Sequence, residues 1–346
     1  PEVDRELSVV VDDWRLTDEA ALAGDFDQMP DWTHGGRIGK LVHAVVSPNP
    51  VGVKSHERLR QRLDNTATDR VMVIGLHGME GAIVALDGMP LAAPETTDHA
   101  VLGPAQRADF IADVTAEEGD HAIIAIHEGE DAFILTEIPV AGSQSAVPRG
   151  PIPVLPPNPA TSLTSSSGAR DVPLVMAGGA MGGLREGIWK GERMSIQELV
   201  DNGQVWTFNG VAGLPEAPLV EAAQGELIRI PMQNDTAFPH AMHLHGHHFQ
   251  EELPDGSLGP LRDTLTVARR ETRIGDVHDA AAFIPRLGLE HAVHLAADAA
   301  HADDQGANRP RITHIASPLP ERADRSAVPS SGATHLRSPR TIGSAG

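Results

Sequence analysis

The sequence PHAMHLHGHHF, Pro239–Phe249, predicts a β-strand that carries five of the 18 histidines of the chain: His240, His243, His245, His247 and His248. Side chains on a strand alternate between two faces. We therefore expect His243 and His245 on one face, where both can reach one metal cluster, and His240 on the other, where it can serve a different metal. Imidazole is the commonest ligand of copper, zinc and iron, which favours metal binding. A loosely metal-binding surface strand and hydrogen-bonded core histidines are the alternatives.

Outward from this strand, the chain is a series of short alternating or apolar runs separated by turn residues. Those before it are Glu6–Trp14, Arg70–Leu76, Ala82–Gly88, Arg107–Thr115, His121–Glu128 and Asp131–Val140. A second group comprises Gln204–Asn209, Glu226–Asn234, His240–Glu251 and Asp263–Ala268. Runs of this length, rich in Val and Ile, predict an all-β sandwich or barrel fold. No segment before Arg269 has a long helical period.

The composition changes twice along the chain and suggests two domains. Residues Ala141–Pro173 are dense in Pro and Ser, which predicts an extended linker. Beyond about His301 the chain is polar and rich in Pro, Ser and Arg, which predicts disorder. We expect one domain over 1–142, a linker over 143–171, a second domain over 172–300 that is atypical after 268, and a disordered tail over 301–346.

Length, charge and cysteine content limit the function. The 346 residues suffice for two domains, and a formal net charge of −21 argues against nucleic acid and anionic membranes as partners. No apolar run approaches the roughly 20 residues of a membrane helix, and we expect any export signal to lie outside these residues. The absence of cysteine excludes disulfides, thiolate nucleophiles and the thiolate that a blue-copper centre requires.

Two segments carry a family resemblance. NDTAFPHAMHLHGHHF (Asn234–Phe249) and LGPLRDTLTVA (Leu258–Ala268) resemble the last domain of bacterial laccase-like multicopper oxidases. The earlier segments Glu6–Leu16, Met29–Lys40, Val84–Pro94 and Leu102–Val114 are similar to the middle domain, and Val175–Leu184 and Trp206–Asp235 to the run that leads into the last. The resemblance implies two cupredoxin-like Greek-key β-sandwich domains with an irregular C-terminal tail.

The resemblance also implies copper ligands. In the family, the first His of His-x-x-His-x-His binds the type 1 copper, and the next two bind the trinuclear cluster as type 2 and type 3 ligands. These roles fall on His240, His243 and His245. His247 and His248 have no ligand role in that pattern and are expected to pack locally or to support the ligands.

By resemblance, the expected function is a copper-dependent oxidoreductase. Such an enzyme takes electrons from phenols, amines or metal ions and reduces O₂ to water, and it works in the periplasm or outside the cell. Its expected partners are a small-molecule electron donor and O₂. His34, in a Trp-Thr-His-Gly-Gly segment, is expected to be structural, because the family does not use it as a ligand.

Two departures from the family pattern open an alternative. The sequence starts where the family's middle domain starts, so we expect another chain to supply the ligands of the first domain. After Asp263–Ala268, the family's His-Cys-His-x-x-x-His is replaced by Arg269–Asp304, in which His291, His294 and His301 have other spacings. A frame shift near Arg269 or true divergence explains this, and either predicts poor sheet packing after Arg269.

The alternative function is therefore a catalytically inactive, truncated or frame-shifted copper-binding cupredoxin protein. A zinc hydrolase ranks third, because no His-Glu-x-x-His spacing occurs.

Overall fold

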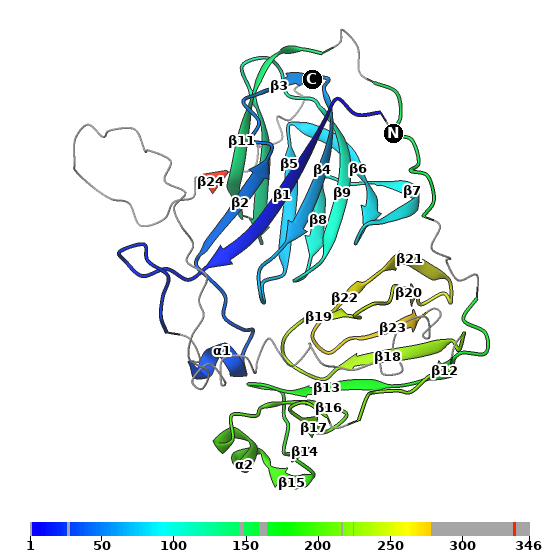
Figure 1. Cartoon of the computed structure of the whole chain (residues 1–346). Coiled ribbons are helices and arrows are strands. Elements are labelled where there is room, and N and C mark those ends of the chain that lie inside the picture. Colours follow the sequence, from blue (N-terminus) through cyan, green and yellow to red (C-terminus); the bar gives the residue numbers. More distant parts are fainter. Residues whose placement is uncertain are drawn as a thin grey trace, which may run out of the picture.

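The computed structural model describes residues 2–25, 28–129, 131–144, 149–158, 165–215, 217–223, 225–277 and 335–336. Its strands form two units, an upper and a lower one in Figure 1. The described helices are both short: α1 (Met29–Thr33) and α2 (Ile196–Asp201). The predicted all-β class is therefore confirmed. Within the described part of the chain, neither helix is long and apolar enough to cross a membrane.

The first unit contains two sheets. One has the order β2-β1-β4-β9-β6-β7. Its strands are β1 (Arg5–Trp14), β2 (Leu41–Ser47), β4 (Arg58–Asn65), β6 (Met79–Leu86), β7 (Met89–Thr96) and β9 (Arg107–Val114). The other has the order β24-β11-β10-β5-β8, with β3 paired to β11. Its strands are β3 (Val53–Ser55), β5 (Met72–His77), β8 (His99–Leu102), β10 (His121–Glu128), β11 (Asp131–Ser143) and β24 (His335–Leu336).

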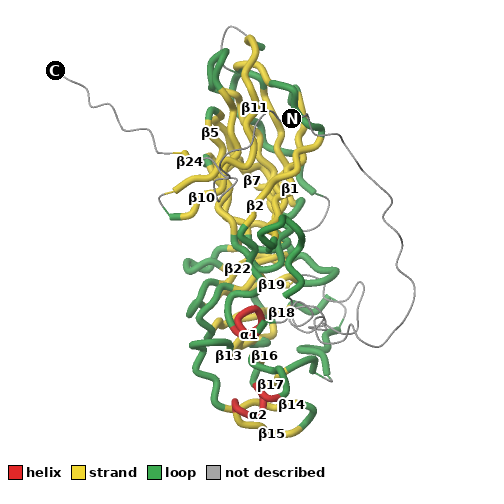
Figure 2. Tube along the Cα trace, turned by 90° about the vertical axis from the view of Figure 1, so that its left-hand side faces the viewer, coloured by secondary structure: helices red, strands yellow, loops and turns green. Residues whose placement is uncertain are grey.

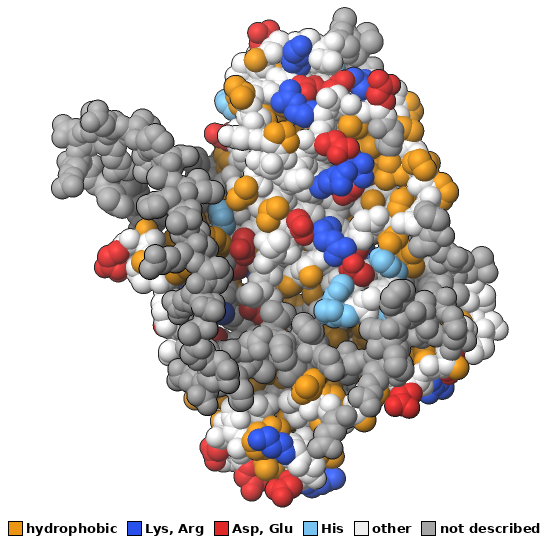
Figure 3. All heavy atoms as spheres, in the orientation of Figure 1, with side chains coloured by type: hydrophobic (Ala, Val, Ile, Leu, Met, Phe, Trp, Pro, Cys, Tyr) orange, Lys and Arg blue, Asp and Glu red, His pale blue; other side chains and the backbone are white. Residues whose placement is uncertain are grey.

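Strand alternation places one core between these sheets. In β1, Leu7, Val9 and Val11 are fully buried and their neighbours are not, and they join Phe110 of β9 and Ile124 of β10 in one cluster. The opposite face of the first sheet is charged, as Figure 3 shows. Its ion pairs are Arg58–Asp113, Arg60–Asp109 and Arg62–Glu6.

The second unit is built on a ten-stranded sheet of order β15-β14-β17-β16-β13-β18-β23-β20-β21, with β12 paired to β18. Its strands are β12 (Arg170–Asp171), β13 (Leu174–Gly178), β14 (Glu186–Trp189), β15 (Glu192–Ser195), β16 (Trp206–Phe208), β17 (Val211–Ala212), β18 (Ile228–Asn234), β20 (Phe249–Glu252), β21 (Leu258–Arg262) and β23 (Thr272–Val277). A separate two-stranded sheet pairs β19 (His240–His243) with β22 (Thr264–Val267).

The two-stranded sheet lies between the units in Figures 1 and 2. Its inner side chains Met242, Leu265 and Val267 join the core of the second unit with Ile230 and Met232 of β18. Its other side approaches the first unit. The sheet that carries the histidines is therefore held from both sides.

The histidine strand is shorter than the sequence predicts. Strand β19 ends at His243, and the chain then turns through residues 244–248 before β20 begins. Gly246 has a φ of +73°, which other residues rarely adopt. The prediction of one strand over His240–Glu251 is wrong, because this glycine allows a turn that interrupts the strand between β19 and β20.

The Pro- and Ser-rich segment does contribute to a core. Leu155 is buried against Val84, Ala85 and Ile111 on the first unit. Arg58 donates a hydrogen bond to the Gly150 carbonyl over 2.6 Å. This stretch therefore packs against the first unit where it is described. No strand lies between β11 and β12 among the described residues, and the predicted domain boundaries stay a prediction.

The regular sheet continues past Arg269. Strand β23 pairs antiparallel with β18 from Thr272 to Val277 and, on its other side, with β20 from Ile274 to Val277. The expectation of poor sheet packing after Arg269 is therefore wrong for residues 272–277. The predicted irregular region and tail, with His291, His294 and His301, lie outside the described residues apart from 335–336.

Asp276 is an anomaly inside β23. Its side chain is fully buried, and neither carboxyl oxygen has a hydrogen-bond partner among the described residues. Burial, followed by the nearby charge of Glu252, raises its pKa to about 6. Ionisation of Asp276 therefore opposes folding.

We predict that Asp276→Asn stabilises the protein above pH 6 and not at pH 4. The native pKa lies above the ordinary value of 3.8, so the cost of ionisation is absent below pH 3.8, grows with pH and is complete above about pH 6. The expected gain at pH 7.5 is roughly 1–3 kcal/mol in the free energy of unfolding. Urea unfolding at both pH values measures it, and an equal gain at pH 4 would contradict the assignment.

Candidate metal centre

The three predicted ligands lie in two different environments. His243 and His245 are exposed, with ring centroids 4.9 Å apart and ring planes at 70°. His240 is partly buried, and its ring meets the edge of Trp206 at 5.4 Å between centroids. Strand alternation places His240 and His243 on opposite faces of β19. In the turn after β19, the ring of His245 lies next to that of His243. The structure thus brings His243 and His245 together and keeps His240 apart.

The hydrogen bonds of His240 leave one ring nitrogen available. Its Nε2 lies 2.9 Å from the Thr236 hydroxyl. That hydroxyl has one proton and already lies 2.7 Å from the Asn234 side-chain oxygen and 2.9 Å from the Phe238 carbonyl, both of which only accept. We therefore assign the Nε2 proton to a bond with Thr236, which leaves the lone pair on Nδ1. Burial lowers the pKa of His240 to about 4, so the ring is neutral at pH 7.

His243 has the opposite tautomer. Its Nδ1 lies 3.4 Å from an Asp263 carboxyl oxygen and 3.0 Å from the Thr264 hydroxyl. Since the carboxylate only accepts, Nδ1 carries the proton and Nε2 keeps its lone pair. A hydrogen bond from imidazole to carboxylate fixes the ring of many metal-binding histidines. The bond to Asp263 also raises the pKa of His243.

Asp263 in turn is held by the first unit. Arg107 of β9 binds both of its carboxyl oxygens, at 3.2 and 2.7 Å. Burial would raise the pKa of Asp263, but hydrogen bonds from His243, Arg107 and Thr264 outweigh it and hold the pKa well below its usual range. The carboxylate that orients His243 therefore belongs to the second unit and is itself held by Arg107 of the first unit.

A second carboxylate strengthens the same contact. Asp87 is buried in the turn between β6 and β7, where its φ of +50° precedes Gly88 at +79°. It accepts hydrogen bonds from the backbone N–H groups of Arg107, Asp263 and Thr264, at 3.0, 3.3 and 3.2 Å. This role was not predicted from the sequence. The Asp-Gly pair signals a hairpin turn but not what the carboxylate contacts.

The loop before β9 packs directly on the histidine sheet. Gln106 donates to the Thr264 carbonyl over 3.0 Å and accepts from the Thr266 hydroxyl over 2.8 Å. A Cβ on Gly103 would lie 2.4 Å from the Thr266 hydroxyl, so no side chain fits there. This close approach fixes β22, and through it β19, against the first unit.

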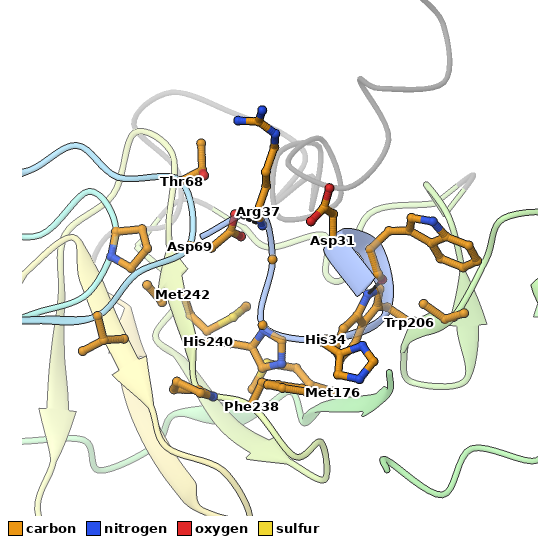
Figure 4. A pocket seen from close by; sticks show the side chains of 18 of the residues that line it. Asp31, His34, Arg37, Thr68, Asp69, Met176, Trp206, Phe238, His240 and Met242 are labelled. Carbon is orange, nitrogen blue, oxygen red and sulfur yellow. Dashed lines mark hydrogen bonds between the residues drawn. The ribbon is translucent and has the colours of Figure 1, made fainter. Parts of the chain in front are cut away.

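A cavity of about 600 Å³ opens beside His240, at the junction of the two units. Figure 4 shows Asp31, Arg37 and Asp69 along one side, and His240, Phe238 and Met176 along the other. Trp206 closes it further and donates its indole N–H to the Trp32 carbonyl over 2.6 Å. Burial raises the pKa of Asp69, which accepts a hydrogen bond from the Arg37 backbone N–H at 3.0 Å. The cavity is therefore aromatic near His240 and acidic at its far side.

The remaining predicted histidines occupy supporting positions. His34 is exposed at the cavity and contacts the Phe238 ring edge at 5.9 Å. His247 is buried, and its Nδ1 lies 3.1 Å from the His245 carbonyl, to which it donates. His248 is partly buried. Among the residues that the structure describes, no three His, Cys, Asp or Glu side chains are gathered closely enough to hold a metal by themselves.

Two family models, both of multicopper oxidases, match residues 24–138 and 190–276. The second match continues past Arg269 to the residue before the end of β23. Multicopper oxidase MmcO of Mycobacterium tuberculosis is 26% identical over 266 residues, which are 73% of this chain and 47% of that protein. The chain thus spans about half the length of this curated relative.

Solved structures match over both units. Lac15 from a marine microbial metagenome is 35% identical, with a TM-score of 0.61 over 81% of this chain and 60% of its own. A multi-copper oxidase from Pseudomonas Thermotolerans is 20% identical, with a TM-score of 0.62 over 80% of this chain and 62% of its own, and it supports the fold alone. The predicted cupredoxin-like fold class is confirmed.

We predict that Arg107→Ala lowers the free energy of unfolding by about 1–3 kcal/mol, because it leaves the partly buried Asp263 carboxylate without its bidentate partner. Arg193→Ala is the matched control. Its pair with Glu186 is exposed, so its removal is expected to change stability by less than about 0.5 kcal/mol. Urea unfolding measures both variants, and equal losses would exclude a special role for Arg107.

We also predict that His240 and His243 titrate far apart in the metal-free protein. His240 should titrate near pH 4, and His243 above the ordinary 6.5. Asp263→Asn should lower the pKa of His243, because the hydrogen-bonded carboxylate charge is gone, and leave His240 unchanged. NMR titration of the ring protons measures both values. A common midpoint near 6.5 would disprove the two environments.

Proposed function

Because the chain belongs to the multicopper oxidase family, we propose that it forms the copper-binding part of a laccase-like oxidoreductase. In this proposal the complete enzyme takes electrons from phenols, amines or metal ions and reduces O₂ to water. The observation that carries the proposal is the histidine strand. Its two sides present imidazoles in different environments, each with one nitrogen held by a hydrogen bond and the other left for a metal.

The residues fit copper on the side of His243 and His245. Their rings are adjacent and exposed, and the Asp263 carboxylate holds the His243 ring through Nδ1, so that Nε2 can bind. We propose these two residues as ligands of the trinuclear cluster and His240, through Nδ1, as a type 1 ligand. Bound copper would supply a one-electron Cu(II)/Cu(I) couple. The chain's own residues set ring orientation and keep His240 uncharged.

The residues do not fit a complete blue-copper centre. Its thiolate ligand comes from cysteine, and none of the 346 residues is cysteine. His243 and His245 also need further ligands to hold a trinuclear cluster. We propose that these come from beyond the described residues, including from another chain that contributes a cupredoxin domain.

The cavity beside His240 is our candidate for the electron-donor site. Trp206 and Phe238 offer aromatic faces for a phenol or aromatic amine, and Asp31 and Asp69 offer acceptors for its hydroxyl or amino protons. Asp31 is held in place by Arg15, whose guanidinium binds both carboxyl oxygens. By the same family membership we propose that the protein acts in the periplasm or outside the cell.

A copper-binding protein without oxidase activity is the second candidate. The absence of cysteine favours it for this sequence, since the family passes electrons to the trinuclear cluster through the Cys of its His-Cys-His motif. Oxygen consumption in the presence of a phenol separates the candidates.

We predict that Cu(II) titration of the wild type shows binding that a His243→Ala/His245→Ala variant lacks. The double variant should bind about one equivalent less, because it removes both adjacent imidazoles. The exposed His121 supplies the control, and His121→Ala should bind as the wild type does. No intense blue band should form in any variant. Equal copper binding by the double variant would contradict the ligand assignment. A blue band would contradict the conclusion that the protein has no thiolate ligand for copper.

A further inference from the structure

Two other histidines meet on the first unit, away from the candidate metal centre. His77 ends β5 and His127 lies in β10, the neighbouring strand in the same sheet (Figure 2). Their Nε2 atoms are 3.1 Å apart, whereas the ring centroids are 5.1 Å apart. The nitrogen-bearing edges therefore lean toward each other.

A glycine makes this approach possible. Gly75 precedes His77 by two residues on the same face of β5, and a Cβ there would lie 2.3 Å from His127 Nε2. The His127 ring thus lies across the backbone of Gly75, in space that any other residue would fill. His127 pairs with Val73 in the register, four residues from His77, so its ring reaches His77 only across this gap.

A carboxylate and a third imidazole lie next to the pair. His99 of β8 is directly opposite Gly75, on the same face, and its Nδ1 is 2.8 Å from Asp98. The charge of Asp98 acts to raise the pKa of His77, although burial and His127 lower that pKa overall. The charge of His127 in turn contributes to lowering the pKa of Asp98. Asp98 is therefore within electrostatic range of both rings.

We propose that His77 and His127 form a binding site for a first-row divalent cation, with Cu(II) bound most tightly and water completing the coordination. Metal–nitrogen bonds of about 2.05 Å to atoms 3.1 Å apart subtend an angle of about 98°, between square-planar and tetrahedral values. Burial and the neighbouring His127 lower the pKa of His77, so this imidazole is ready to bind without losing a proton at pH 7. Nearby Asp98 compensates part of the cation's charge.

This site is independent of the candidate metal centre. It uses strands β5 and β10 of the first unit, whereas His240, His243 and His245 belong to the second. A test in a His240→Ala/His243→Ala/His245→Ala background therefore removes all three candidate ligands and reports on the new site, whatever the outcome for the proposed function.

In that background, isothermal titration with Cu(II) should show a site that His77→Ala/His127→Ala weakens by about tenfold or more. Gly75→Ala should also weaken it, because the new methyl group displaces the His127 ring while both imidazoles remain. Gly24→Ala is the matched control, since a Cβ there contacts nothing within 4 Å. His121→Ala controls for loss of an exposed histidine. The EPR spectrum of the bound Cu(II) should show two imidazole nitrogens.

Unchanged Cu(II) affinity and an unchanged EPR spectrum in His77→Ala/His127→Ala would overturn the proposal. The pair would then be only a hydrogen bond between neutral rings. Circular dichroism checks that each variant is folded. If the double variant does not fold, Gly75→Ala decides, and wild-type copper affinity in that variant would overturn the proposal equally.

Discussion

The hydrogen bond between Asp263 and His243 determines how the candidate metal centre is built. The carboxylate fixes the tautomer of the imidazole and, at the same time, binds Arg107 of the first unit across the junction. One side chain therefore couples the docking of two domains to the orientation of a candidate ligand. Asp87 adds rigidity because its carboxylate accepts hydrogen bonds from the backbone N–H groups of Arg107 and Thr264, one on each side of the junction. Movement between the units would disturb the ring of His243 before it disturbed that of His240.

The two sides of β19 hold their histidines in different environments. On one side, His240 is kept neutral by burial among Trp206, Phe238 and Thr236. On the other, His243 is kept basic by a carboxylate and stands exposed beside His245. The same short strand therefore offers a sheltered imidazole toward the cavity and an open pair toward the opposite side. Neither environment depends on the other, since their hydrogen-bond partners do not overlap.

Sequence patterns predicted the β-fold and the histidine separation because both follow from strand alternation, a local property. The alternation of β1 appears directly in its buried Leu7, Val9 and Val11. The turn after His243 was not predicted, although Gly246 marks it, since a single glycine within a histidine-rich segment also fits a strand. The roles of Asp87, Arg107 and Asp263 were beyond prediction. Asp263 is 156 residues from Arg107 and 176 residues from Asp87, and only the docking of two units brings it to them. The helix over Ile196–Asp201 was not predicted, although the Ser195–Glu198 capping box is a local sequence signal for its start.

Gly103 shows how little freedom the junction leaves to evolution. A Cβ added at this residue would clash with the Thr266 hydroxyl at 2.4 Å and lie in tight contact with the Ala241 Cβ at 3.1 Å. An alanine there is among the smallest changes a protein can undergo, yet it would act as a wedge between the domains. Drift in the surface of either unit must therefore be matched by the other, and the two cannot diversify separately. In a library of random substitutions, we expect few folded variants changed at Gly103. Changes on the charged outer face of the first sheet should be tolerated.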